Sequence, residues 1–272
     1  MRAADAVPRP VPFSRAARAV FDLSLEGMLW SRRSLLMGFL LALPAVFALV
    51  YRIVAAGRAH PAVSGSDLYG GFIVALYSVR NALPLVALFY ATSLVADEVE
   101  GKTITYLLSR PVQRTAILVG KFGAYLATTL SLALPATTVA FFLLASGPGS
   151  AGIAAGAADL ARDLGVMALA LLSYGAAFTL LGVVVRRPVV PGLLFLLAWE
   201  WVANLPGYMP RLTITAYLRS LLRHRPPDEG FLQMTAETLP ASLCLGVLVG
   251  TSLVSLVLAA WIFSKREYVL EQ

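Results

Sequence analysis

The sequence predicts an all-α integral membrane protein with six transmembrane helices, and three observations support this fold class. Hydrophobic residues make up 58% of the 272-residue chain and charged residues 14%, against roughly 45–50% and about 25% in soluble domains. The mean hydropathy is +0.77. The apolar residues form six long runs, and most charged residues lie between these runs. This distribution is typical of helices that cross a bilayer and of loops that leave it.

Residues 1–34 are predicted to precede the membrane domain as a disordered start followed by an amphipathic helix. Closely spaced prolines occupy the first part of this segment. From Phe13 onward, apolar side chains recur at helical spacing, with Arg15 and Arg18 on the opposite side. A helix with this pattern lies in the plane of the membrane interface, and we expect it on the cytoplasmic side.

Residues 35–272 are predicted to form one membrane domain. About 20 apolar residues cross the ~30 Å hydrocarbon core of a bilayer, and this length identifies the individual spans. A Gly- and Ala-rich stretch, residues 146–163, is expected to be a flexible outer loop. Leucines alternate with arginines between Arg211 and Arg225, which predicts a short amphipathic helix on the outer face. The six predicted spans are residues 35–54, 71–96, 118–145, 164–185, 189–206 and 241–263.

The distribution of lysine and arginine predicts that both termini are cytoplasmic. Most of the 22 basic residues fall in segments that this orientation places inside, in agreement with the positive-inside rule. The basic residues do not form a single stripe, so binding to nucleic acid is not expected. With one cysteine and two histidines, no metal site is expected either.

The longest charged segment, residues 97–121, lies between the second and third predicted spans. Acidic residues at its amino end and Arg110 further along suit the dipole of a short helix. Pro111 would end this helix, because proline disfavours helical geometry in the preceding residue and lacks a backbone N–H. The segment therefore predicts a short amphipathic helix on the cytoplasmic surface, where it can contact a soluble partner.

The same segment carries a recognisable pattern of residues. The pattern comprises Glu98, Glu100-Gly101-Lys102-Thr103, Leu107-Leu108-Ser109-Arg110-Pro111, Arg114 and Gly120-Lys121. It resembles the loop of the permease subunits of type-2 ABC exporters, the bacterial ABC-2 membrane protein family. Lys102 departs from the family pattern, in which the glycine and threonine are adjacent. The resemblance implies a coupling helix that docks on an ATPase through Glu98, Glu100, Gly101, Leu107, Arg110, Pro111 and Arg114.

The resemblance also implies the partners and the location of the protein. We expect two copies of a cytoplasmic ABC ATPase, a second identical or homologous permease, and a bacterial cytoplasmic (inner) membrane. The chain itself is not expected to be an enzyme or to hold a cofactor. Gly101-Lys102-Thr103 ends like a phosphate-binding loop, but Ala96 stands where that motif needs its first glycine. ATP and Mg²⁺ are therefore expected on the partner subunit.

Two ionisable residues lie deep in the predicted spans, Arg80 in the second and Glu200 in the fifth. Each costs about 2.5–3.5 kcal/mol at the centre of a membrane helix on insertion scales, so both should face protein, water or each other. One hypothesis is that they pair beside the translocation path; the alternative is that they only fix helix packing. The candidate residues of the path are Arg80, Asn81, Trp199, Glu200 and Asn204.

The predicted function is the transmembrane permease subunit of an ATP-driven exporter, which moves substrate across the cytoplasmic membrane when coupled to a separate ATP-binding subunit. One alternative is an ATP-independent secondary transporter or channel that uses Arg80 and Glu200, although no internal repeat typical of that class is evident. Another is an intramembrane enzyme, for which the spans offer no recognisable nucleophile. No residue in the spans indicates the substrate.

Overall fold

The fold was taken from a computed structural model that describes most of the chain. In the described residues all regular structure is helical, so the predicted fold class is confirmed at this level. The side chains of residues 32, 33, 95–100, 199–201 and 203 are not described. The described residues are 12–57, 63–100, 113–146, 152–185, 187–203, 209–224 and 239–265.

Five of the described helices are long and apolar enough to cross a membrane, rather than the six predicted. The first span is α2 (Arg32–Ala56), and the second is a continuous helix made of α3 (Gly65–Asp67), η1 (Leu68–Ala82) and α4 (Leu83–Glu100). The other three are α6 (Arg114–Ala145), α7 (Ile153–Val184) and α10 (Ala241–Lys265). The predicted fifth span corresponds to α8 (Val189–Ala203), an apolar helix of which the structure describes 15 residues.

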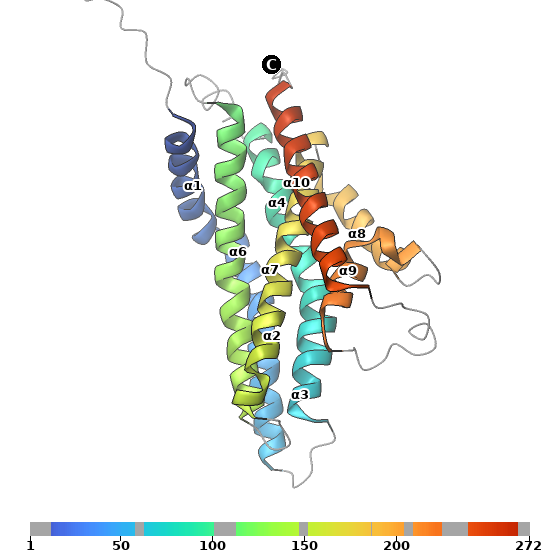
Figure 1. Cartoon of the computed structure of the whole chain (residues 1–272). Coiled ribbons are helices and arrows are strands. Elements are labelled where there is room, and N and C mark those ends of the chain that lie inside the picture. Colours follow the sequence, from blue (N-terminus) through green and yellow to red (C-terminus); the bar gives the residue numbers. More distant parts are fainter. Residues whose placement is uncertain are drawn as a thin grey trace, which may run out of the picture.

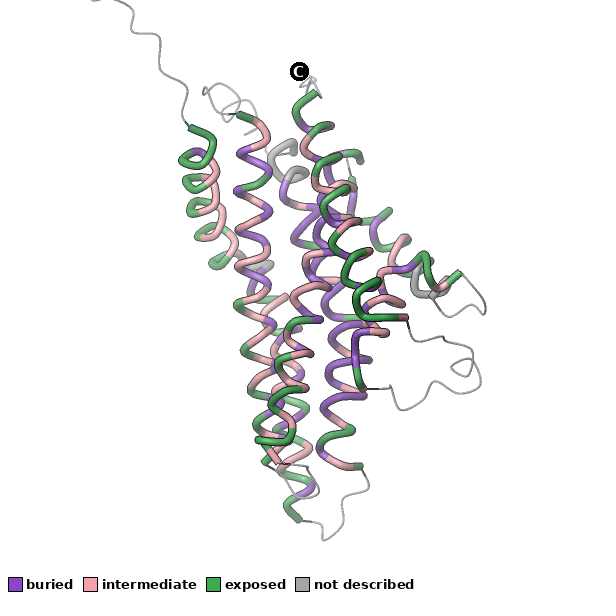
Figure 2. The backbone as a smooth tube through the Cα atoms, viewed as in Figure 1, coloured by how far each residue is buried: buried purple, intermediate pink, exposed green. Residues whose placement is uncertain are grey.

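The long helices run alongside one another, and α8 leans away from them (Figure 1). The central helices are α7 and the η1–α4 helix, which are mostly buried, whereas α2 and α10 expose most of their apolar side chains (Figure 2). In a membrane protein such exposed apolar faces meet lipid or another transmembrane helix. The core of the bundle therefore lies between the second, third and fourth long helices.

The helix before the first span, α1 (Phe13–Leu29), packs against the beginning of α6 (Figure 1). The two helices approach closely at Gly120, where an added Cβ would lie 2.5 Å from the carbonyl oxygen of Ala17. Ser31 caps the following helix α2 by accepting a hydrogen bond from the Ser34 N–H at 3.1 Å, so a defined turn connects α1 to α2.

The second long helix contains an unusual π-helical stretch, η1, of 15 residues. Most π-helices are single turns, and they occur frequently at functional sites. The side-chain amide of Asn81 donates to the carbonyl oxygen of Leu76 at 2.7 Å. Pro84, which has no N–H, follows directly as the helix returns to α geometry in α4. Arg80 thus lies in the last turn of the π-helical stretch.

The start of α7 differs from the sequence prediction, whereas the predicted short amphipathic helix is present. Residues 153–163 are helical, although they were expected to be part of a flexible loop. The short amphipathic helix is present as α9 (Ile214–Leu221) after the 3-10 turn η2 (Met209–Leu212). It packs on α7 and α10, with Leu218 and Leu221 buried.

Candidate functional site

The predicted coupling segment begins at the end of α4. The helix of the second span continues through Glu98 to Glu100, so these acidic residues prolong that helix rather than begin a separate one. No proline or glycine interrupts the sequence between Leu94 and Glu100, which explains the continuation. Gly101, Leu107, Arg110 and Pro111 lie outside the described residues, and the structure therefore does not describe the coupling helix.

Hydrogen bonds connect the helices that flank this segment. The Lys121 amino group of α6 donates to the carbonyl oxygen of Leu94 in α4 at 2.9 Å. Arg114, the first residue of α6, donates to the carbonyl oxygen of Ser264 in α10 at 3.4 Å. The flanks of the coupling segment are therefore tied both to each other and to the last span.

The first span, α2, is also bonded to the helices that flank the coupling segment. The Tyr90 hydroxyl of α4 donates to the Ser34 hydroxyl of α2 at 2.6 Å. On the other side of α6, the ring of Phe21 in α1 lies against Gly123. The end of the bundle that the charge pattern predicts to be cytoplasmic is thus one connected unit of α1, α2, α4, α6 and α10.

The structure locates only part of the predicted translocation path. Arg80 is half-buried in η1, and Asn81 is exposed. The side chains of Trp199 and Glu200 are not described, and Asn204 lies outside the described residues. Whether Arg80 and Glu200 pair therefore stays a prediction.

A close contact joins α4 and α8. Leu88 packs directly against Gly192, where an added Cβ would overlap its side chain. Arg80 lies eight residues before Leu88, and Glu200 lies eight residues after Gly192. Beyond this contact α8 leans away from the long helices (Figure 1), so the contact does not by itself place Glu200 beside Arg80.

A second cluster of charged residues, at the opposite end of the bundle, was not identified from the sequence. Asp163 of α7 has only 1% of its side chain exposed, and its Oδ2 lies 3.1 Å from Nε2 of His224. One turn earlier, Oδ1 of Asp159 accepts from Arg223 at 3.0 Å. The spacing of two aspartates at i and i+4 was the available signal, since such residues lie on one face of a helix.

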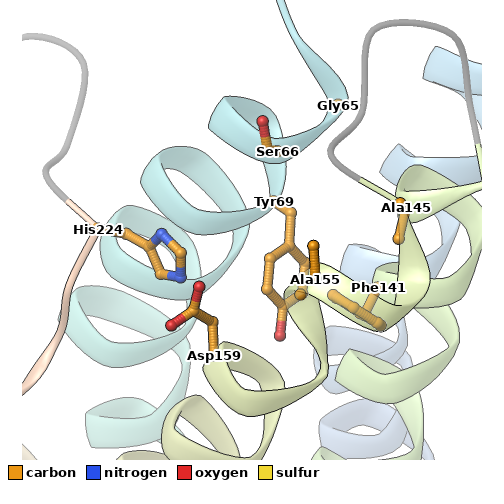
Figure 3. Close-up of a pocket in the computed structure, with 10 residues that line it drawn as sticks. Gly65, Ser66, Tyr69, Phe141, Ala145, Ala155, Asp159 and His224 are labelled. Carbon is orange, nitrogen blue, oxygen red and sulfur yellow. The ribbon is translucent and has the colours of Figure 1, made fainter.

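A small pocket of about 100 Å³ adjoins this cluster (Figure 3). Its walls include the aromatic rings of Tyr69 and Phe141, whose centroids are 5.2 Å apart. Tyr69 is 4% exposed, and in the part of the chain that the structure describes its hydroxyl makes no hydrogen bond. The lining residues are Gly65, Ser66, Tyr69, Phe141, Ala145, Gly152, Ala155, Gly156, Asp159 and His224.

The five long apolar helices define a multi-pass α-helical membrane protein. The chain belongs to the ABC-2 family of transporters, because the model described as "ABC-2 family transporter protein" matches residues 31–268. This match confirms the resemblance observed in the segment between the second and third spans. No curated protein matches the chain.

Proposed function

We propose that this chain is the permease subunit of an ATP-driven exporter in a bacterial cytoplasmic membrane, with both termini in the cytoplasm. Membership of the ABC-2 family implies association with an ATP-binding subunit. In this proposal ATP and Mg²⁺ bind to that partner, and the chain itself neither hydrolyses ATP nor holds a cofactor. The direction of transport follows from the resemblance of the coupling segment to that of type-2 exporters.

The observation that carries the proposal is the connection between the helices that flank the coupling segment. A force applied between Glu100 and Arg114 would act on α4 and α6 together, because Lys121 bonds to the end of α4. The same force would reach α10 through Arg114. A partner that pushes on this segment would therefore move several spans and not only a surface loop.

We assign distinct roles to the residues of the segment. Glu98, Glu100 and Gly101 would form the docking surface for the ATPase, with Leu107 on the apolar face of the coupling helix. Arg110 and Pro111 would form the turn after that helix. Arg114 would pass the movement to α6 and, through its hydrogen bond to Ser264, to α10.

The translocation path would lie between two permease copies. The exposed apolar faces of α2 and α8, which include Phe39, Ile53 and Leu194, could pack against a second copy within the bilayer. Closure of the two ATPase subunits would then shift the population between an inward-open and an outward-open arrangement. In this arrangement Arg80, Asn81, Trp199, Glu200 and Asn204 would face the path.

Copurification tests the proposed docking surface. The tagged chain is isolated in mild detergent from its native membrane, as wild type, as Glu100→Arg and as the control Asp22→Arg. Asp22 is an exposed acid of α1, so the control applies the same charge reversal outside the coupling segment. We expect an ATPase with a phosphate-binding loop to accompany the wild type and the control but not Glu100→Arg. Equal recovery from all three would exclude Glu100 from the docking surface.

A further inference from the structure

The segment after α9 is held tightly against the predicted outer ends of η1 and α7. Leu221 and Leu222 are buried, and Arg162 of α7 donates from Nε to the carbonyl oxygen of Leu221 at 2.7 Å. The imidazole of His224 lies directly on the backbone of η1, because a Cβ added at Gly70 would overlap the ring. Residues 221–224 therefore close over the junction between the second and fourth spans.

The charged and titratable groups around His224 come from three directions. Asp163 and Asp159 face it from α7, and Arg223 is its neighbour in the same segment. Tyr69 of η1 presents its ring at a centroid distance of 6.1 Å and an interplanar angle of 82°. Asp163 is almost fully buried, so its negative charge needs a partner in place of water.

The partners of the two aspartates differ in importance. The Arg223–Asp159 pair is largely exposed, with 64% of the arginine side chain and 32% of the aspartate side chain accessible. Exposed ion pairs of this kind contribute little to stability. The His224–Asp163 pair is buried on the carboxylate side, and the loss of one partner from a buried pair is strongly unfavourable. The contact of residues 221–224 with α7 therefore depends more on the His224–Asp163 pair than on the Arg223–Asp159 pair.

We propose that His224 and Asp163 form a protonation-sensitive latch, which holds residues 221–224 against η1 and α7 and weakens when the imidazole loses its proton. A neutral imidazole can still donate one hydrogen bond, but it no longer balances the charge of the buried carboxylate. The hydroxyl of the neighbouring Tyr69 already lies close to Asp163 without a hydrogen bond of good geometry among the described residues, so it could then donate to that carboxylate. Release of the latch would remove His224 from the wall of the pocket.

The electrostatic environment of His224 gives the direction of the pH dependence. The hydrogen bond to Asp163 raises the pKa of His224 above its ordinary value, and burial only partly opposes this effect. A raised pKa in the folded state means that protonation stabilises the closed latch. This contribution is complete below the pKa of an unperturbed histidine, about 6.5, and is lost as the pH rises through the folded-state pKa.

Hydrogen exchange of the full-length chain in detergent micelles tests the latch. Wild type, His60→Gln, His224→Gln and Asp163→Asn are compared between pH 5.5 and pH 9, with correction for the intrinsic exchange rate. In wild type and His60→Gln we expect the amides of residues 218–224 to exchange severalfold faster at high pH, because the stabilisation by the protonated imidazole is lost there. In the other two variants this pH dependence should be absent.

The two histidines of the chain, His60 and His224, provide a second measurement that does not require a latch mutant to fold. In His60→Gln, NMR of labelled histidine reports the titration of His224 alone. A midpoint above about 6.5 that coincides with the change in exchange would support the latch. An unshifted midpoint, or exchange that is independent of pH in wild type, would overturn it. Neither measurement uses ATP or a partner, so failure of the latch is distinguishable from failure of the proposed function.

Discussion

At the scale of single residues, the pairing of Arg80 with Glu200 is a hypothesis that rests on the position of both charges within the predicted spans. Leu88, eight residues after Arg80, contacts Gly192, eight residues before Glu200, but α8 leans away from the bundle beyond this contact. A charge at membrane depth normally faces protein or a water-filled cavity. The half-buried position of Arg80 in η1 agrees with this expectation.

A double-mutant cycle tests the pair. Arg80→Gln and Glu200→Gln are made singly and together, and thermal unfolding is measured in the same detergent. If the side chains interact, we expect the double variant to be more stable than the sum of the single effects predicts, by about 0.5–3 kcal/mol. Effects that add without any coupling would show that the two residues act independently.

The cluster of charged residues around Asp163 and His224 shows which parts of a site cannot be predicted from a sequence. Asp163 could be recognised as a charge next to an apolar run, but its partner His224 lies 61 residues further along the chain. No local pattern predicts a contact over such a separation. The pattern of the coupling segment, by contrast, is continuous in the chain and can be recognised directly in residues 97–121.

At the scale of helices, the contact of α1 with α6 depends on the absence of a side chain at Gly120. Ala17 approaches so closely there that any added Cβ meets its carbonyl oxygen, at 2.5 Å. Phe21 and Gly123 form a neighbouring contact between the same two helices. Small residues commonly permit such close approach between helices in membranes.

A matched pair of glycine substitutions tests this packing of α1 against α6. Gly120→Ala should destabilise the protein by about 1–3 kcal/mol, as expected for overpacking, because backbone atoms rather than a flexible side chain oppose the new methyl group. Gly165→Ala, in the open face of α7, should instead stabilise by about 0.5–1 kcal/mol through helix propensity. Both are measured by thermal unfolding in micelles. A gain in stability for Gly120→Ala would contradict the observed packing of α1.

Some of the helices could be predicted from the sequence and others could not. Long apolar runs identified the five long spans, and the alternation of leucine and arginine identified α9, because hydrophobicity and its periodicity are local properties. The early start of α7 could not be predicted, since the partner of its buried Asp163 is His224, far along the chain. The π-helical geometry of η1 has no strong sequence signature. Of the predicted fifth span, residues 189–206, the structure describes the 15 residues of α8.

At the scale of the whole molecule, the two ends of the bundle have different kinds of connection. The predicted cytoplasmic end joins several helices through hydrogen bonds that flank the coupling segment. The predicted outer end is closed by residues 221–224 through a titratable contact. This arrangement suits a permease in which ATP acts at one end and access to the outside is controlled at the other.

ATP hydrolysis by the complex isolated through this chain is the most direct test of the central claim. The complex is purified from native membranes by a tag on the chain and reconstituted in lipid, and the release of phosphate from Mg-ATP is measured for wild type, Asp22→Arg and Glu100→Arg. The account predicts hydrolysis by the first two and at least a tenfold loss in Glu100→Arg, corresponding to about 1.4 kcal/mol. An intact wild-type preparation without any ATPase activity would contradict the account and favour a transporter that does not depend on ATP.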